Sequence, residues 1–92
     1  MNLAQQIQDD DFLERMVRGG RIMGTNINFK SMGLGFYVFR GEKLNEDTAL
    51  RVCYNQKQER WEVFDPEELD AKYPVCTNRS IQPCVHFCIS IL

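Results

Sequence analysis

The sequence predicts a small α+β domain, with an antiparallel sheet of about four to six strands and one or two short helices. Two observations favour this class. Apolar and polar residues alternate with the period of a strand in several runs, which are separated by polar or glycine-rich turns. Helix-start signals are few, and each is soon followed by a helix breaker. A chain of 92 residues can bury one modest core, so residues 1–92 are expected to form a single domain.

The first expected element is a helix over about residues 11–18. Asp11 followed three residues later by Glu14 is a capping-box pattern. Gly19 then ends the apolar face with a residue that accepts positive φ. Residues 1–10 do not continue that face, so we expect them to form a separate helical turn or a loose arm.

Two hairpins are expected in the middle of the chain. Residues 23–29 alternate between apolar and polar, whereas the run 36–39 is apolar on both faces, which favours a central strand. The glycine-rich stretch between them is the expected turn. Residues 50–54 and 61–64 form the second pair of alternating runs, around a polar turn at 55–59.

The last part of the chain is expected to hold one more helix and the final strands. Asp65 is an N-cap candidate and Pro66 suits the first helical position, which predicts a short helix over about 65–72. A Tyr-Pro pair stops this helix, and strands are expected at about 75–77 and 84–91. Because an apolar terminal strand must be covered, the second of these strands also suggests a homodimer through the C-terminal strand.

Composition excludes several classes of protein. The apolar and charged fractions, 43% and 26%, are those of an ordinary globular protein. No apolar run approaches the roughly 20 residues that span a bilayer, so no membrane partner is expected. The N-terminal residues lack a basic region followed by an apolar stretch, which is the pattern of a secretory signal. We therefore expect a cytoplasmic protein whose four cysteines are reduced thiols.

Charge is segregated along the chain. Segment 13–43 carries six bases against two acids, and segment 44–72 carries eight acids against four bases, although the whole chain has a net charge of −2. Asymmetry of this kind bears on the steering of a partner rather than on the fold. Folding can also interleave the two segments and remove the asymmetry.

No enzyme class gains support from the motifs. Cys53, Cys76, Cys84 and His86 provide enough ligands for zinc, but no Cys-x-x-Cys knuckle is present, and small cysteines commonly fill cores. A zinc-binding domain is therefore kept only as the second alternative. The cysteines lack a setting that lowers a thiol pKa, and the glycine pairs match neither a P-loop nor a dinucleotide fingerprint. The sequence thus predicts no catalytic residues, no metal and no cofactor.

The first alternative is a nucleic-acid-binding domain. Segment 13–43 interleaves bases with aromatic residues, the ingredients of a stacking platform with a cationic rim. Its basic candidates are Arg18, Arg21, Lys30, Arg40 and Lys43. The pI of about 5.3 and a core strand expected at the aromatic residues argue against this alternative.

The favoured hypothesis is a non-catalytic module that binds another protein. Interfaces are commonly anchored by aromatic residues and steered by charge. The candidate contact residues are Glu67, Glu68, Asp70, Trp61 and Tyr73. Trp61 has an equally good alternative role as the largest core residue of a small domain. By analogy with other small untethered chains, the hypothesis extends to an inhibitor or accessory protein of bacterial or phage type.

Overall fold

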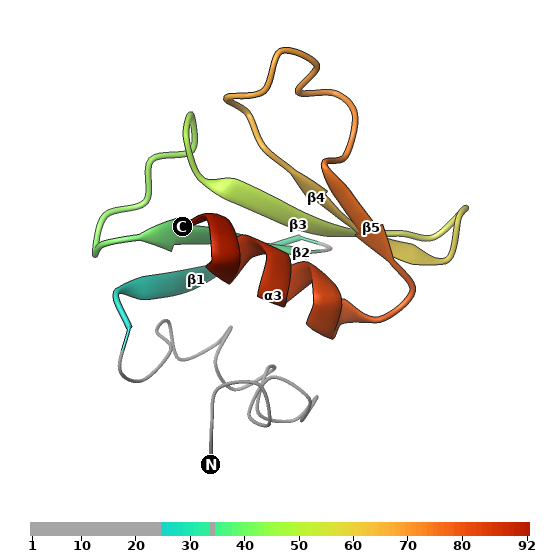
Figure 1. Ribbon diagram of the computed structural model, residues 1–92, viewed down its shortest axis with the longest axis horizontal. Coiled ribbons are helices and arrows are strands. Elements are labelled where there is room, and N and C mark those ends of the chain that lie inside the picture. Colours follow the sequence, from blue (N-terminus) through green and yellow to red (C-terminus); the bar gives the residue numbers. More distant parts are fainter. Residues whose placement is uncertain (1–24, 34) are drawn as a thin grey trace.

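The computed structural model describes residues 25–33 and 35–92, and it has the α+β fold that the sequence predicts. Five strands form one antiparallel sheet in the order β1-β2-β3-β4-β5, so each strand lies beside its neighbour in sequence (Figure 1). The elements are β1 (Ile27–Met32), β2 (Gly35–Arg40), β3 (Leu50–Asn55), β4 (Arg60–Phe64), β5 (Cys76–Asn78) and α3 (Ile81–Ile91). The expected helix at 11–18 and the arm at 1–10 lie outside the described residues.

Both predicted hairpins are confirmed, although the first strand begins later than expected. β1 pairs with β2 around a turn that contains Gly33, whose φ of 45° suits glycine. β3 pairs with β4 around the polar turn, and Tyr54 faces Trp61 across the two strands. The predicted strand at 75–77 is present as the short β5, which pairs with β4.

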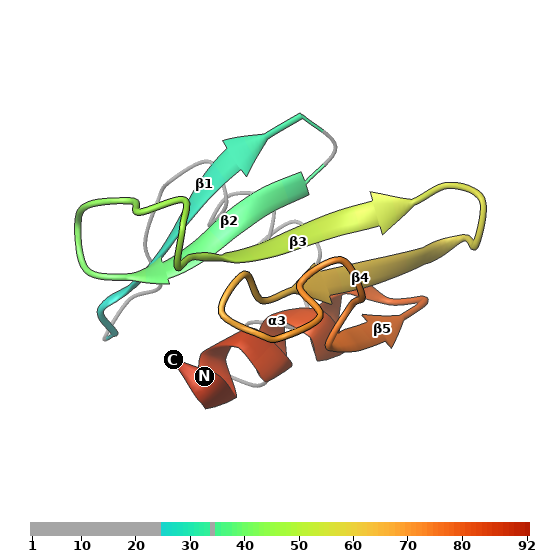
Figure 2. The same ribbon diagram turned by 90° about the horizontal axis from the view of Figure 1, so that it is seen from above.

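Helix α3 covers one face of the sheet and closes the core (Figures 1 and 2). Alternation along the strands directs one set of apolar side chains toward α3, and these side chains are buried: Ile27, Phe29, Phe36, Val38, Leu50, Val52 and Val63. The helix contributes Cys84, Val85 and Cys88, which are fully buried. Burial of this apolar surface is the main stabilising term of so small a fold.

The predicted strand at 84–91 is wrong, because these residues belong to α3. Residues 81, 84, 85 and 88 are apolar or cysteine and recur at intervals of three and four, so they lie on one side of a helix. Pro83 fits the first turn, where its missing N–H costs no hydrogen bond. The β-branched and aromatic composition suggested a strand, but a helical face that packs on the sheet decides the conformation. The expected homodimer through a C-terminal strand therefore loses its basis, because the C-terminal residues form a helix.

The predicted helix at 65–72 is also wrong, because this segment forms consecutive turns. The capping interaction exists, since the Asp65 carboxylate accepts a hydrogen bond of 3.0 Å from the backbone N–H of Glu67. The backbone carbonyl of Asp65 accepts another of 3.2 Å from Glu68. No apolar face of the segment is buried, so no tertiary packing offsets the unfavourable free energy of helix nucleation. Local capping alone therefore closes a turn and propagates no further.

The described part of the chain contains no helix with the length and apolarity needed to cross a membrane.

Candidate functional site

The face of the sheet opposite α3, here called the open face, carries a row of alternating basic and aromatic side chains. In the strand register Lys30 pairs with Tyr37, Tyr37 with Arg51, and Arg51 with Phe64. Paired residues point to the same side of a sheet, so the four side chains share the open face. The Arg51 guanidinium carbon lies 5.0 Å from the centre of the Phe64 ring, a cation–π contact.

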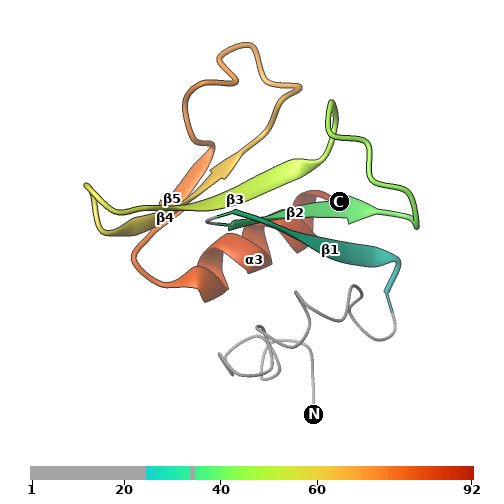
Figure 3. The same cartoon turned by 180° about the vertical axis from the view of Figure 1, so that it is seen from behind.

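Two loops rise beside this row. The β2–β3 loop (41–49) and the β4–β5 loop (65–75) leave the same end of the sheet, because alternate connections of an antiparallel meander share an end (Figures 1 and 3). The hydrogen bond from the backbone N–H of Ala49 to the carbonyl of Asn45, 2.9 Å long, helps to shape the first loop. The second is held by its turns, including a bond of 2.9 Å from the N–H of Tyr73 to the carbonyl of Asp70.

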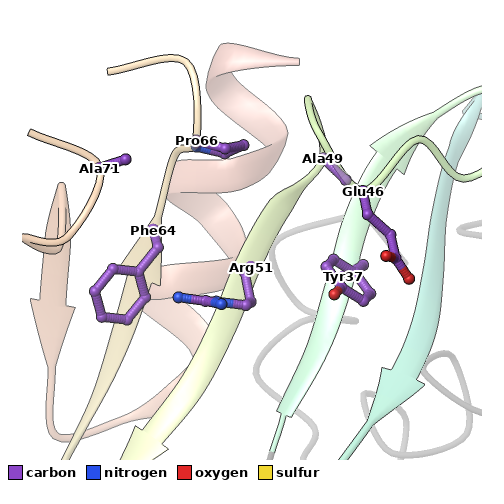
Figure 4. Close-up of a pocket in the computed structure, with 7 residues that line it drawn as sticks. All are labelled: Tyr37, Glu46, Ala49, Arg51, Phe64, Pro66 and Ala71. Atoms are coloured by element: carbon purple, nitrogen blue, oxygen red, sulfur yellow. The ribbon is translucent and has the colours of Figure 1, made fainter. Parts of the chain in front are cut away.

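A hollow of about 220 Å³ lies between the two loops (Figure 4). Its lining comes from the open face and from both loops: Tyr37, Arg51, Phe64, Glu46, Ala49, Pro66 and Ala71. Arg51 stands between the two aromatic rings in this view. The hollow thus combines apolar walls with one basic and one acidic side chain.

The two loops together are strongly acidic. They carry seven acids against two bases, a net charge of −5. The acids are Glu42, Glu46, Asp47, Asp65, Glu67, Glu68 and Asp70, and the bases are Lys43 and Lys72. Among the described residues the ion pair is Arg60–Glu62, with an N–O distance of 2.9 Å on strand β4, and none joins a loop acid to another described residue. We call loops 41–49 and 65–75 the acidic loop surface.

The tip of the second loop exposes two large apolar side chains. Leu69 is fully exposed and Tyr73 is 61% exposed. The Lys72 ammonium group lies 5.4 Å from the centre of the Tyr73 ring. A single exposed leucine is common on protein surfaces. Two such residues within an acidic loop give this surface both apolar and charged contacts.

Four of the five residues predicted to bind a partner protein lie on this surface. Glu67, Glu68, Asp70 and Tyr73 are exposed and belong to the β4–β5 loop. Trp61 does not join them. It lies on the α3 side of the sheet, with its ring centre 5.2 Å from that of Tyr54 in an edge-on packing.

The predicted nucleic-acid residues are spread over different parts of the described structure. Lys30 is on the open face, Arg40 pairs with Ile27 at the end of β2, and Lys43 is in the first acidic loop. The aromatic residues Phe29 and Phe36 pack edge to face in the core, with ring centres 5.6 Å apart. Arg18 and Arg21 lie outside the described residues. The described members therefore form no continuous basic surface.

Among the candidate zinc ligands, Cys53 and His86 lie apart from the others. Cys84 and Cys88 are buried residues of α3, whereas His86 is exposed and Cys53 points to the open face. No group of three His, Cys, Asp or Glu side chains in residues 25–33 and 35–92 is arranged to hold a metal ion. Burial raises the pKa of Cys84 to about 12 and raises the pKa values of Cys53 and Cys88 as well. These three thiols are therefore protonated at neutral pH, which disfavours a cysteine nucleophile.

Sequence reasoning missed the hollow. Tyr37, Arg51 and Phe64 are far apart in sequence, and only the register of two neighbouring strand pairs brings them side by side. The signal was partly available, because each lies at an alternating position of a predicted strand.

No family model, no curated protein and no solved structure matches this chain.

Proposed function

We propose that this protein is a non-catalytic module that binds a basic segment of another protein through the acidic loop surface. One observation carries the proposal. Two loops with a net charge of −5 lie at the same end of the sheet, and one of them exposes the side chains of Leu69 and Tyr73. By occupying its partner, such a module acts as an inhibitor or an accessory protein. That role follows by analogy with other small modules.

Electrostatics supports a basic partner. Seven acids in two neighbouring loops repel one another and lower the stability of the free protein. A partner rich in lysine and arginine removes this repulsion and is attracted from a distance, which raises the rate of association. The same charge repels a nucleic-acid backbone.

Apolar contacts supply the rest of the affinity. Interfaces gain most of their binding energy from a few large side chains that become desolvated. Leu69 and Tyr73 are the exposed candidates on the loop. The rings of Tyr37 and Phe64 form walls of the hollow beside it, and Arg51 offers N–H donors to the carbonyl oxygens of a bound chain.

A second candidate function rests on the open-face row. Its alternation of Lys30, Tyr37, Arg51 and Phe64 suits a single-stranded nucleic acid, whose bases stack on rings while cations contact phosphates. The acidic loop surface borders the Arg51 and Phe64 end of the row, where Glu46 also lines the hollow. We therefore rank this function below protein binding.

Charge reversal tests the proposed function. The probes are two fluorescein-labelled peptide pools of equal length, one rich in Lys and Arg with scattered apolar residues, the other its charge-inverted counterpart rich in Glu and Asp. We expect the basic pool to bind. Glu68→Lys should weaken binding about three- to tenfold at low salt, and the effect should shrink as salt screens exposed charges. Fluorescence anisotropy measures the affinities.

Glu59→Lys is the matched control, because Glu59 is an exposed acid in the turn at the other end of the sheet. Equal effects of the two reversals, or equal binding of both pools, would reject the acidic loop surface. Labelled oligo(dT) and a mixed-sequence RNA form a parallel series. Tighter binding of either one than of the basic peptides, strengthened by Glu68→Lys, would favour nucleic acid.

A further inference from the structure

Three thiols gather between the sheet and α3. Cys76 lies in β5, opposite the fully buried Val63, and its side chain is therefore on the α3 side of the sheet. Cys84 lies in the first turns of α3, and its Sγ is 3.8 Å from the backbone oxygen of Trp61 in β4. Because Trp61 pairs with Asn78 of β5, Cys84 sits over the same strand pair that carries Cys76. Cys88 follows one helical turn later.

The Cys76 and Cys84 thiols are close neighbours, because the pKa of Cys84 is raised by burial and also by the Cys76 thiol. The chain between their elements is short, because only residues 79–80 separate the end of β5 from the start of α3 (Figure 2). This connection limits how far the two sulfur atoms can move apart. Cys76 is partly exposed, which gives a small oxidant access, whereas Cys84 is buried.

We propose that Cys76 and Cys84 are a disulfide-forming pair, and that oxidation joins strand β5 covalently to the first turns of α3. This property is independent of partner binding, because the acidic loop surface contains neither cysteine. It assigns a specific role to two of the four thiols and leaves Cys53 and Cys88 as packing residues.

The chemistry needs a disulfide oxidant, for which oxidised glutathione serves. The Cys76 thiolate attacks one sulfur of oxidised glutathione, forms a mixed disulfide and releases one glutathione thiolate. The Cys84 thiolate then attacks the Cys76 sulfur, forms the Cys76–Cys84 bond and releases the second glutathione. Both cysteine protons end on the two released glutathione molecules. The protein loses two electrons and two hydrogens, which reduce one molecule of oxidised glutathione to two of the thiol form.

The second step is slow at neutral pH, since burial raises the pKa of the Cys84 thiol and keeps it protonated. Below this pKa the thiolate fraction grows about tenfold for each pH unit, so closure of the disulfide should accelerate steeply between pH 7 and 9. The closed loop restricts the unfolded chain. We therefore expect the oxidised protein to melt roughly 5–15 °C higher than the reduced protein, with the gain lost after reduction.

Peptide mapping tests the pair directly. The purified protein is incubated with excess oxidised glutathione at pH 8.5, free thiols are blocked with N-ethylmaleimide, and the protein is digested with trypsin without reductant. Cleavage after Lys72 and Arg79 places Cys76 in peptide 73–79, and Cys84 and Cys88 in peptide 80–92. We expect mass spectrometry to find these two peptides linked, with the loss of two hydrogens.

The Cys88→Ala variant should keep the link, Cys76→Ser should lose it, and Cys53→Ser should behave as the unchanged protein. Where a variant does not fold, fragmentation of the linked wild-type peptides identifies the bonded cysteine in 80–92. A bond to Cys88, a bond within 80–92, a glutathione adduct on Cys76 without the link, or four unmodified thiols would each overturn the proposal.

Discussion

Replacing Val85 with aspartate is expected to unfold the protein. Val85 is fully buried in α3 and belongs to the core cluster between the helix and the sheet. An aspartate at this position places an unpaired carboxylate among apolar side chains, at a cost of several kcal/mol even after relaxation. The total stability of a small domain is only about 5–15 kcal/mol, so most or all of it is lost.

His86→Asp is the matched control, because it introduces the same side chain at the next helical position, which is exposed. We expect this variant to melt close to the unchanged protein. Thermal unfolding followed by circular dichroism compares the two. A cooperative transition of Val85→Asp at the temperature of His86→Asp would show that α3 does not pack on the sheet.

Gly35→Ala should cause the second largest loss of stability. Gly35 opens β2 and pairs with Cys53 of β3, and a Cβ atom built on it would overlap the backbone carbonyl oxygen of Val52. The obstacle is backbone at the centre of the sheet, so the two strands must separate locally. We expect a loss of about 1–3 kcal/mol, as for other overpacked core positions, measured by urea unfolding.

Gly33→Ala separates this clash from the general effect of losing a glycine. Gly33 has a φ of 45°, and no atom lies within 4 Å of the Cβ that alanine would add. Only backbone strain opposes this change, at about 1 kcal/mol. Equal losses for the two variants would mean that β2 and β3 are not as close at Gly35 as described.

The strands could be predicted because their signals are local. Three alternating runs, one continuous apolar run and the turn residues between them identified β1 to β4, although the start of β1 was placed too early. The last quarter of the chain misled the prediction for a physical reason. The residues of α3 have a strand-like composition. Their apolar helical face is stabilised only by packing against the sheet, which a local sequence pattern does not show. The loop at 65–75 is the reverse case. Its capping signals are strong, but it has no apolar face to bury, so it forms no helix.

The candidate site could be predicted only in part. The acids Glu67, Glu68 and Asp70 stand close together in sequence, so a shared surface was a reasonable inference. These acids lie beside the β2–β3 loop because of the strand order in the sheet, and local sequence patterns did not predict that order. The residue type of Trp61 suits an interface and a core equally well, and the structure places its ring on the α3 side of the sheet, packed against Phe36 and Tyr54 and away from these acids.

The central claim is that the acidic loop surface contacts the partner, and amide chemical-shift mapping tests it most directly. The ¹⁵N-labelled protein is titrated with the tightest-binding basic peptide from the pools, and shifts are followed residue by residue. We expect the largest changes in loops 41–49 and 65–75 and around Arg51 beside the hollow. Changes concentrated on α3, on β1 or in the turn at 56–59 would contradict the claim.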